Sequence, residues 1–306
     1  MKNKNRKLIR DIKKDLDLYI LLVPAFLIAF VLMYYVPMYG VVIAFKDYNL
    51  LKGILHSDWV GFAHFARLFR SPDFLLIIRN TLLLNLYNLI FGFPMPIILA
   101  LFINEAGNVL FKRSVQSFLY IPHFISWVVL GGIVVSLLSP STGVINGIIK
   151  MFGGEPIYFM ADSFWWPVWY TISGIWKEAG WGTIIYMAAI SGVDPSLYEA
   201  AAVDGAGRFR KMWHITLPCI RGTIVVLLIM NLGKMMNSGF EQVYALQNSS
   251  VRSVSEVIST YVYRLGIQGG QYGYTAALGL FQSVIGMILI IAANKTTKAL
   301  GENGLW

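Results

Sequence analysis

Side chains that can hydrogen-bond, carry charge or stack lie within long apolar stretches of this 306-residue sequence, and nine of them are the strongest candidates for chemistry. Polar and ionisable groups are costly to place in hydrocarbon, so they usually face a protein interior or a water-filled cavity. Amide, hydroxyl, ammonium, carboxylate and indole groups together suit the binding of a polar solute. We therefore predict a solute pathway lined by Asn85, Asn88, Trp176, Lys177, Glu178, Asn231, Lys234, Ser238 and Gln282.

The spacing of polar residues favours a shared helix face in two of these stretches. Residues at offsets of 0, 3, 7 and 10, or 0, 4, 7 and 11, fall on one face at about 3.6 residues per turn. The two sets with such spacing are Asn231, Lys234, Ser238 and Glu241, and Thr275, Gly279, Gln282 and Gly286. A structural role is the alternative, because small residues are typical of helix packing and Glu178 can form a buried ion pair with Lys234.

The composition places these residues in a membrane protein. Hydrophobic residues make up 57% and charged residues only 13% of the chain, with a mean hydropathy of +0.61. An average soluble domain is about one quarter charged, so a soluble enzyme, a DNA-binding domain and a disordered scaffold are excluded. The single cysteine, Cys219, excludes an internal disulfide and a cysteine-built metal site. No pair of histidines or carboxylates has the spacing of metal ligands, so we expect no metal site.

Six apolar stretches are long enough to cross a bilayer, whose hydrocarbon core of about 30 Å requires roughly 20 residues of helix. The predicted spans cover about residues 18–36, 81–103, 116–138, 165–190, 220–240 and 273–294. Residues 1–17 form a basic tail, and residues 18–306 form a single transmembrane domain. The fold class we predict is all-α, an integral membrane protein with six transmembrane helices.

Lysine and arginine set the orientation of the spans, because cytoplasmic loops carry an excess of both. With the N-terminus inside, the cytoplasmic segments hold 15 of the 25 lysines and arginines, and the outer segments hold eight. We therefore predict a protein of the cytoplasmic membrane with both termini cytoplasmic. This topology explains most of the net charge of +9, so no nucleic-acid partner is required.

The predicted cytoplasmic loop of residues 194–218 is long for a connector and is typical of a structured segment. Ser196 with Glu199 three residues later matches a capping box, and Gly205 permits the left-handed turn that ends a helix. Thr216 can cap the next span, with Pro218 in its first turn. We expect two short helices at the cytoplasmic surface. The apolar side chains of the second helix need a partner surface or the lipid interface: Phe209, Met212 and Trp213.

The order of residues in this loop resembles the signature of the permease subunits of binding-protein-dependent ABC importers. The matching residues are Glu199-Ala200-Ala201, Asp204-Gly205-Ala206, Ile215 and Leu217-Pro218. Three further segments are similar to the maltose-type permeases: Trp176 with Tyr186, Gly239–Tyr244 and Tyr272–Ala277. The chain is most similar to the polysaccharide-type, lipoprotein-dependent oligosaccharide permeases, over roughly its whole length after the first span.

This resemblance implies that loop 194–218 holds a coupling helix that docks in a groove of an ATPase subunit. The residues that it assigns to the contact are Glu199, Ala200, Ala201, Asp204, Gly205, Phe209, Trp213, Leu217 and Pro218. It also implies a second homologous permease, two ATPase subunits, an extracytoplasmic sugar-binding lipoprotein and an oligosaccharide substrate. This sequence has no phosphate-binding loop of the form G-x-x-x-x-G-K-[ST]. We therefore expect ATP and magnesium in the ATPase subunit, and neither a cofactor nor catalytic residues in this chain.

Lysines outnumber acids within the predicted spans, with Lys177 and Lys234 against Glu178. Charge attraction is screened less in low dielectric than in water, so a uronate-containing oligosaccharide is favoured over a neutral one. If Lys234 neutralises Glu178 and Lys177 reaches towards a polar cavity, no preference remains. Two other classes are open on the residues alone. One is an ion-coupled secondary carrier that uses the same three residues, and the other is a membrane enzyme, for which no cluster of Asp, His or metal ligands is present.

Overall fold

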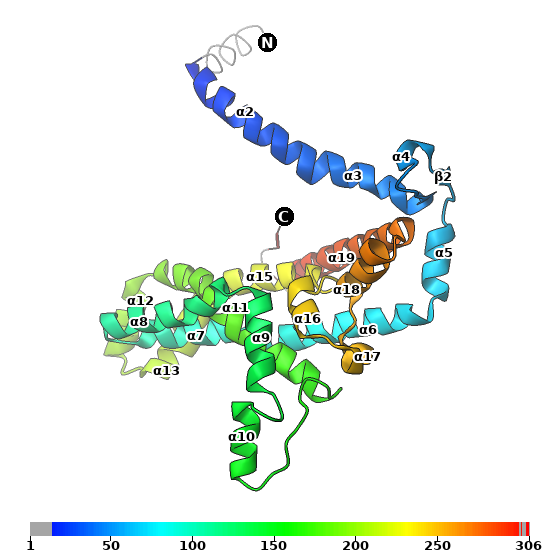
Figure 1. The fold of residues 1–306 in the computed structure, drawn as a ribbon. Helices are drawn as coiled ribbons and strands as arrows, with labels where there is room; N and C mark the ends of the chain where they lie inside the picture. The colour runs from blue at the N-terminus through cyan, green and yellow to red at the C-terminus, as the bar shows by residue number, and fades with distance from the viewer. Residues whose placement is uncertain (1–13, 300, 302–303, 306) are drawn as a thin grey trace. The chain divides into compact units, whose positions relative to one another are not determined.

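The protein is described by a computed structural model that covers residues 14–299, 301 and 304–305 (Figure 1). Most of the predicted basic tail therefore lies outside the described residues. Contacts within the chain define two compact units. One contains the residues up to Phe69 together with Gly270–Leu280, and the other contains Arg70–Gly269 and the residues from Phe281 onward.

The first unit begins with one apolar helical stretch, Leu16–Phe45. It consists of α2 (Leu16–Phe30), η1 (Val31–Tyr35), α3 (Val36–Val41) and η2 (Val42–Phe45). The most apolar part of this stretch has no buried residue, as expected of a surface that faces lipid or another chain. The apolar helix continues to Phe45, beyond the predicted end of the first span at residue 36.

A small folded element follows this helix where the sequence predicts only a loop. Strand β1 (Lys46–Asp47) pairs antiparallel with β2 (Asp58–Trp59), and α4 (Gly53–His56) lies between them. The Lys46 ammonium donates to the carbonyl of Ile54 at 2.6 Å. Helix α5 (Ala63–Arg70) then brings Arg67 to 2.8 Å from the side-chain oxygen of Gln271, which closes the unit.

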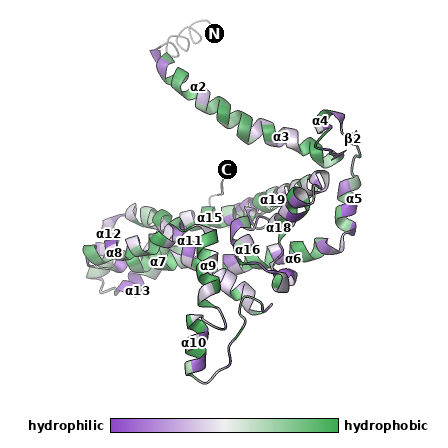
Figure 2. Cartoon of the chain, viewed as in Figure 1, coloured by the Kyte–Doolittle hydropathy of each residue, from purple (hydrophilic) through white to green (hydrophobic). Residues whose placement is uncertain are grey.

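The second unit is built from helices. They are α6 (Pro72–Tyr87), η3 (Asn88–Gly92), α7 (Pro94–Glu105), α8 (Val109–Tyr120), η4 (Ile121–Phe124), α9 (Trp127–Leu137), α10 (Val144–Met151), α11 (Trp165–Ser191), α12 (Pro195–Val203), α13 (Arg208–Lys211), η5 (Met212–Thr216), α14 (Leu217–Cys219), α15 (Arg221–Gly233), α16 (Phe240–Leu246), η6 (Ser249–Val251), α17 (Arg252–Ser255), α18 (Ile258–Val262) and η7 (Tyr263–Gln268). Helix α19 (Tyr272–Ala299) starts in the first unit and ends in the second. Hydrophobic residues dominate α2 and α9, whereas hydrophilic residues gather in α5 and α13 (Figure 2).

Within the described residues, three helices are long and apolar enough to cross a membrane: Leu16–Phe45, Pro72–Glu105 and Tyr272–Ala299. The number rises to five if each of two bent helix pairs counts as one span. Helix α11 has 27 residues and matches the predicted fourth span of 165–190 closely. The total of six spans stays a prediction.

The predicted continuous helix at residues 116–138 is wrong. The helix formed by α8 and η4 ends at Phe124, and α9 begins at Trp127 after a bend of 101°. The Ser126 hydroxyl caps α9 by accepting a hydrogen bond from the Val129 amide. Three carbonyls at the end of η4 receive hydrogen bonds from the ammonium of Lys177 on α11. The bend is therefore stabilised from another helix, which the local sequence does not show.

The predicted fifth span at residues 220–240 is also interrupted. Helix α15 ends at Gly233, and a turn over residues 234–239 separates it from α16. At Gly233 a side chain would collide with Ile290 of α19, so glycine is required where the two helices meet. The predicted common face of Asn231, Lys234, Ser238 and Glu241 therefore does not exist, because no single helix carries all four.

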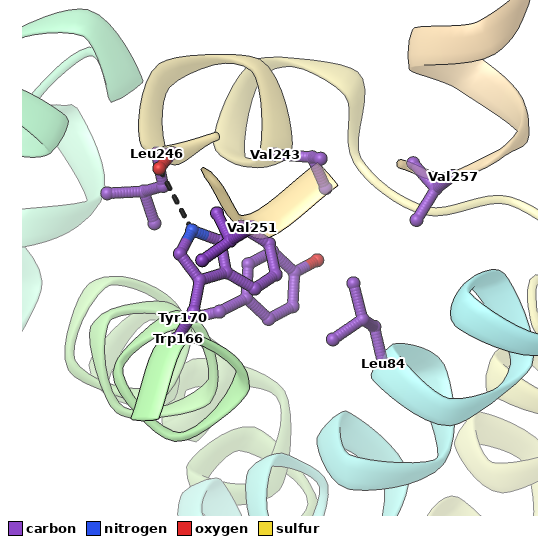
Figure 3. Close-up of a cluster of buried hydrophobic side chains, with 7 residues drawn as sticks. All are labelled: Leu84, Trp166, Tyr170, Val243, Leu246, Val251 and Val257. Carbon is purple, nitrogen blue, oxygen red and sulfur yellow. Dashed lines mark hydrogen bonds between the residues drawn. The ribbon is translucent and has the colours of Figure 1, made fainter. Parts of the chain in front are cut away.

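The core of the second unit lies where α6, α11 and the segment after α15 meet (Figure 3). Its buried side chains are Leu84, Trp166, Tyr170, Val243, Leu246, Val251 and Val257. The indole nitrogen of Trp166 donates to the carbonyl of Leu246 at 2.9 Å, so its one polar group is satisfied. A second cluster joins α7, α11 and the start of α15 through Ala100, Tyr186, Ile190 and Ile220. Both clusters hold α11 at the centre of its unit.

Candidate functional site

The segment of residues 194–218, here called the coupling segment, begins with a capped helix. The cap is Asp194, whose carboxylate accepts a hydrogen bond from the Ser196 amide at 2.9 Å. This bond holds the pKa of Asp194 below its usual value. The predicted capping box of Ser196 and Glu199 is wrong, because Pro195 occupies the first helical position and Ser196 the second. Glu199 is exposed and takes no part in the cap.

Helix α12 ends at Gly205 as predicted. The Ala206 amide donates to the Ala201 carbonyl at 2.8 Å, and the Gly205 amide donates to the Ala202 carbonyl at 3.1 Å. This pair of bonds is a Schellman motif, which needs a left-handed residue at its centre. Gly205 supplies it with φ of 73°. The chain is thereby turned sharply into α13.

The second half of the coupling segment is one helical run, from α13 through η5 to α14. The sequence predicts that Thr216 caps a new helix there. This prediction is wrong, because the Thr216 side chain makes no capping hydrogen bond. It is buried, and its hydroxyl lies 3.0 Å from the Tyr198 hydroxyl of α12. This contact links the two halves of the segment.

Apolar side chains of the coupling segment project from that surface. Val203, Phe209 and Trp213 are 89%, 67% and 65% exposed. Met212, which the sequence places with them, is buried instead and packs inward. Of the other residues assigned to ATPase contact, Glu199, Ala200, Asp204, Gly205 and Pro218 are exposed, and Ala201 and Leu217 are half-buried. The segment is therefore a preformed, partly apolar surface suited to a protein partner.

Lys177, which the sequence assigns to the solute pathway, is buried with only 6% exposed. Its ammonium donates to the carbonyls of Pro122, His123 and Ile125, the last at 2.7 Å. It also lies 5.6 Å from the ring centre of Trp127, a favourable cation–π distance. In this structure the lysine thus stabilises the bend between η4 and α9.

Glu178 lies at the exposed side of the same bend. Its carboxylate is 2.9 Å from His123 Nδ1 and 3.9 Å from the Lys177 ammonium. Among the described residues it makes no ion pair with Lys234, so the structural alternative of a Glu178–Lys234 ion pair is wrong. The His123 ring also stacks on Trp181 at 4.5 Å with an angle of 2° between the rings. Sequence reasoning missed His123, because nothing local shows that residues 123 and 178 meet.

The remaining predicted pathway residues are only partly brought together. Asn85 donates to the Ser238 hydroxyl at 2.9 Å, which links α6 to the turn after α15. Asn231 and Lys234 are exposed at the end of α15. The others lie on separate helices: Asn88 and Trp176 are exposed, and Gln282 is half-buried. Their role in transport stays a prediction.

Residues 92–298 match the family described as "Binding-protein-dependent transport system inner membrane component". Protein LplB of Bacillus subtilis (strain 168) is 50% identical over 96% of this chain and 92% of its own length. The polygalacturonan/rhamnogalacturonan transport system permease protein YteP of the same organism is 49% identical over 100% of this chain and 95% of its own.

The structure is similar to a chain in the crystal structure of a bacterial alginate ABC transporter in complex with an alginate pentasaccharide-bound periplasmic protein. The TM-score is 0.87 and the identity 43%, covering 98% of this chain and 100% of the other. The protein belongs to the family of binding-protein-dependent transport system inner membrane components. It has the permease fold of ABC importers, so the alternatives of an ion-coupled carrier and a membrane enzyme are excluded.

Proposed function

We propose that this permease takes acidic oligosaccharides from an extracytoplasmic binding protein and passes them through the cytoplasmic membrane beside a second permease subunit. Two ATPase subunits dock on the coupling segments and hydrolyse ATP with magnesium. The observation that carries the proposal is the capped and tied coupling segment, which presents Val203, Phe209 and Trp213 to a partner. Exposing apolar side chains to water is unfavourable, so a groove of a partner protein that covers them lowers the free energy.

The substrate class is supported by the relatives. YteP is named for polygalacturonan and rhamnogalacturonan transport, and the similar crystal structure contains a pentasaccharide of alginate, an acidic polysaccharide. Within this chain, Lys234 lies in the turn between α15 and α16, where the helix is broken. Broken helices form substrate sites in other transporters. Among the described residues no carboxylate lies within ion-pair distance of the Lys234 ammonium, so its charge is available to an anionic guest.

The variant Lys234→Met tests this role of the lysine. Uptake of an acidic oligosaccharide by the complete importer should fall at least about tenfold, the ratio that corresponds to 1.4 kcal/mol, whereas uptake of its neutral analogue should change little. Lys295→Met is a matched control, because Lys295 is exposed near the end of α19. Equal losses for both sugars would contradict an electrostatic role. Unchanged uptake would remove Lys234 from the pathway.

The orientation with both termini cytoplasmic is supported by the excess of lysine and arginine in the predicted inner loops. The only thiol, Cys219, can be replaced to give a background without cysteine. A cysteine at Ser249 should then react with an impermeant thiol reagent added to intact cells, and one at Asn108 should not. Labelling of position 108 in intact cells would overturn the orientation.

A further inference from the structure

A pocket of about 640 Å³ lies in the second unit between α6, η3 and the first half of α11. Its size is within the range of small-molecule sites. The walls are mostly hydrocarbon, formed by residues such as Leu83, Tyr87, Phe91, Val168, Ile172 and Ile175. None of the nine predicted pathway residues lines it. An oligosaccharide needs many hydrogen-bond partners, so these walls suit an apolar guest instead.

The pocket is elongated along the two helices. Its lining runs from Arg79 to Phe91 on one side and from Ser163 to Ile175 on the other. Each side covers thirteen residues, whose twelve steps of about 1.5 Å give a length of about 18 Å. At the far end of the pocket, Gly92 lies next to Ile175, because a β-carbon added to Gly92 would be 3.8 Å from the Ile175 side chain. One leaflet of a bilayer has a hydrocarbon depth of about 15 Å, so the pocket has the length of one acyl chain.

An extended acyl chain suits these walls, because it needs only apolar contact along its length and no hydrogen-bond partner. A helix of the second permease is the competing occupant, and the experiment below separates the two.

Arg79 holds a charge at the polar end of the pocket. Its guanidinium donates twice to the Asn80 side-chain oxygen, at 2.9 and 3.2 Å, and once to the Ser253 carbonyl at 2.8 Å. Asn80 is itself buried and donates to the carbonyls of Ser253 and Glu256. All acceptors of Arg79 are neutral, and among the described residues no carboxylate pairs with it. The guanidinium is thus fixed in place with its charge uncompensated, as phosphate recognition requires.

The charges around Arg79 favour an anion over a zwitterion. The buried Glu256 carboxylate is already paired with Arg252 at 3.0 Å and with Arg264 at 2.7 Å. Asp162, next to the opposite rim, accepts hydrogen bonds from the first amides of α11. The positive charges of Arg79, Arg252 and Arg264 therefore outnumber the carboxylates of Glu256 and Asp162 at this end of the pocket.

Aromatic residues mark the same end of the pocket as the level of lipid headgroups. Phe164, Trp165 and Trp169 occupy the start of α11, and Phe164 is exposed beside the pocket. Such aromatic belts lie at the boundary between hydrocarbon and water. The pocket then extends from this boundary into the hydrocarbon, with its cation at the surface. We propose that it binds one acyl chain of an anionic phospholipid, whose phosphate pairs with Arg79.

The experiment uses the complete importer in phosphatidylcholine vesicles that contain a small share of phosphatidylglycerol with a photoreactive group near the end of one acyl chain. After illumination, the label is mapped by mass spectrometry of peptides. We expect it on peptides that contain Phe91 or Ile172. Arg79→Gln should reduce the labelling at least about tenfold, and Ile172→Trp should abolish it by filling the pocket. Arg113→Gln, which removes an exposed arginine from α8, should leave it unchanged.

Several outcomes would overturn the proposal. Photoreactive phosphatidylcholine that labels as strongly as phosphatidylglycerol would refute the anionic headgroup. Labelling that survives both pocket variants would refute the site. A photoreactive residue at position 172 that captures the second permease instead of lipid would show that protein fills the pocket. If Arg79→Gln fails to assemble, Ile172→Trp still decides, because it leaves every hydrogen bond of Arg79 intact. The proposal is independent of the substrate, since the readout involves no sugar.

Discussion

The left-handed turn at Gly205 allows a sharp test of the coupling segment. Gly205 has φ of 73°, and a side chain carbon built there has nothing within 4 Å. Gly205→Ala therefore adds no collision with other residues. Its only cost is that of a left-handed L-residue, about 1–2 kcal/mol. The turn is exposed, so this cost should affect the local conformation and leave the stability of the whole chain almost unchanged.

The chain contains a matched control two residues away. Gly207 lies in the same exposed turn and also has nothing within 4 Å of an added carbon, but its φ is −70°. Gly207→Ala should therefore be neutral, or slightly stabilising because alanine restricts the unfolded chain. Gly205→Asn should be milder than Gly205→Ala, because asparagine tolerates the left-handed region better.

The assay is binding-protein-stimulated ATPase activity of the reconstituted importer, titrated with the ATPase subunit. If docking requires the Schellman turn, a cost of about 1–2 kcal/mol raises the half-saturating concentration roughly 5- to 30-fold. Thermal unfolding of the permease serves as the check that the fold is intact. Identical titration curves for Gly205→Ala and Gly207→Ala would refute the argument that this turn conformation is needed for docking.

Two further predictions concern the helix contacts around α11. Lys177→Met removes this donor from the carbonyls of His123 and Ile125, whereas the Pro122 carbonyl keeps its hydrogen bond from the Ile125 amide, so we expect a loss of about 2 kcal/mol or more in unfolding free energy. Lys150→Met, which removes a single bond to the exposed Pro140 carbonyl, should cost under about 1 kcal/mol; similar melting temperatures for the two variants would contradict this. Gly180→Ala places a methyl group against the Leu119 carbonyl of α8 and should destabilise by about 1–3 kcal/mol. Gly132→Ala, with nothing within 4 Å, is its control, and equal thermal stability of both would show that α8 and α11 can separate freely.

Features fixed by neighbouring residues could be predicted from the sequence. The apolar stretch that becomes α11 has its predicted bounds within about one residue, because composition and length alone define it. Gly205 ends α12 as predicted, because few other residues adopt the left-handed turn. The cap of α12 was harder to predict, since Asp194 and Ser196 are both good capping residues. Because Pro195 fits the first helical position, the residue before it, Asp194, becomes the cap.

Features that depend on distant residues could not be predicted. The bend after Phe124 is stabilised by Lys177 of α11, and the stacked pair of His123 and Trp181 joins two separate helices. The close approach of Gly233 to Ile290 of α19 joins residues 57 positions apart. Helical periodicity assumes a continuous helix, so it placed Asn231 and Ser238 on a face that the break removes. A lysine within a span indicates an unusual site. The residue type alone does not show whether that lysine binds a solute or donates to backbone carbonyls, as Lys177 does.

The bend between η4 and α9 also has a consequence for synthesis of the protein. The Lys177 ammonium that satisfies the Ile125 carbonyl lies 52 residues further along the chain. At about 5–20 residues per second, a ribosome needs roughly 3–10 s to add that length. During this interval the carbonyls of His123 and Ile125 are without this donor. The contact that stabilises the bend can form only after Lys177 of α11 has been synthesised, so the bend is completed late in synthesis.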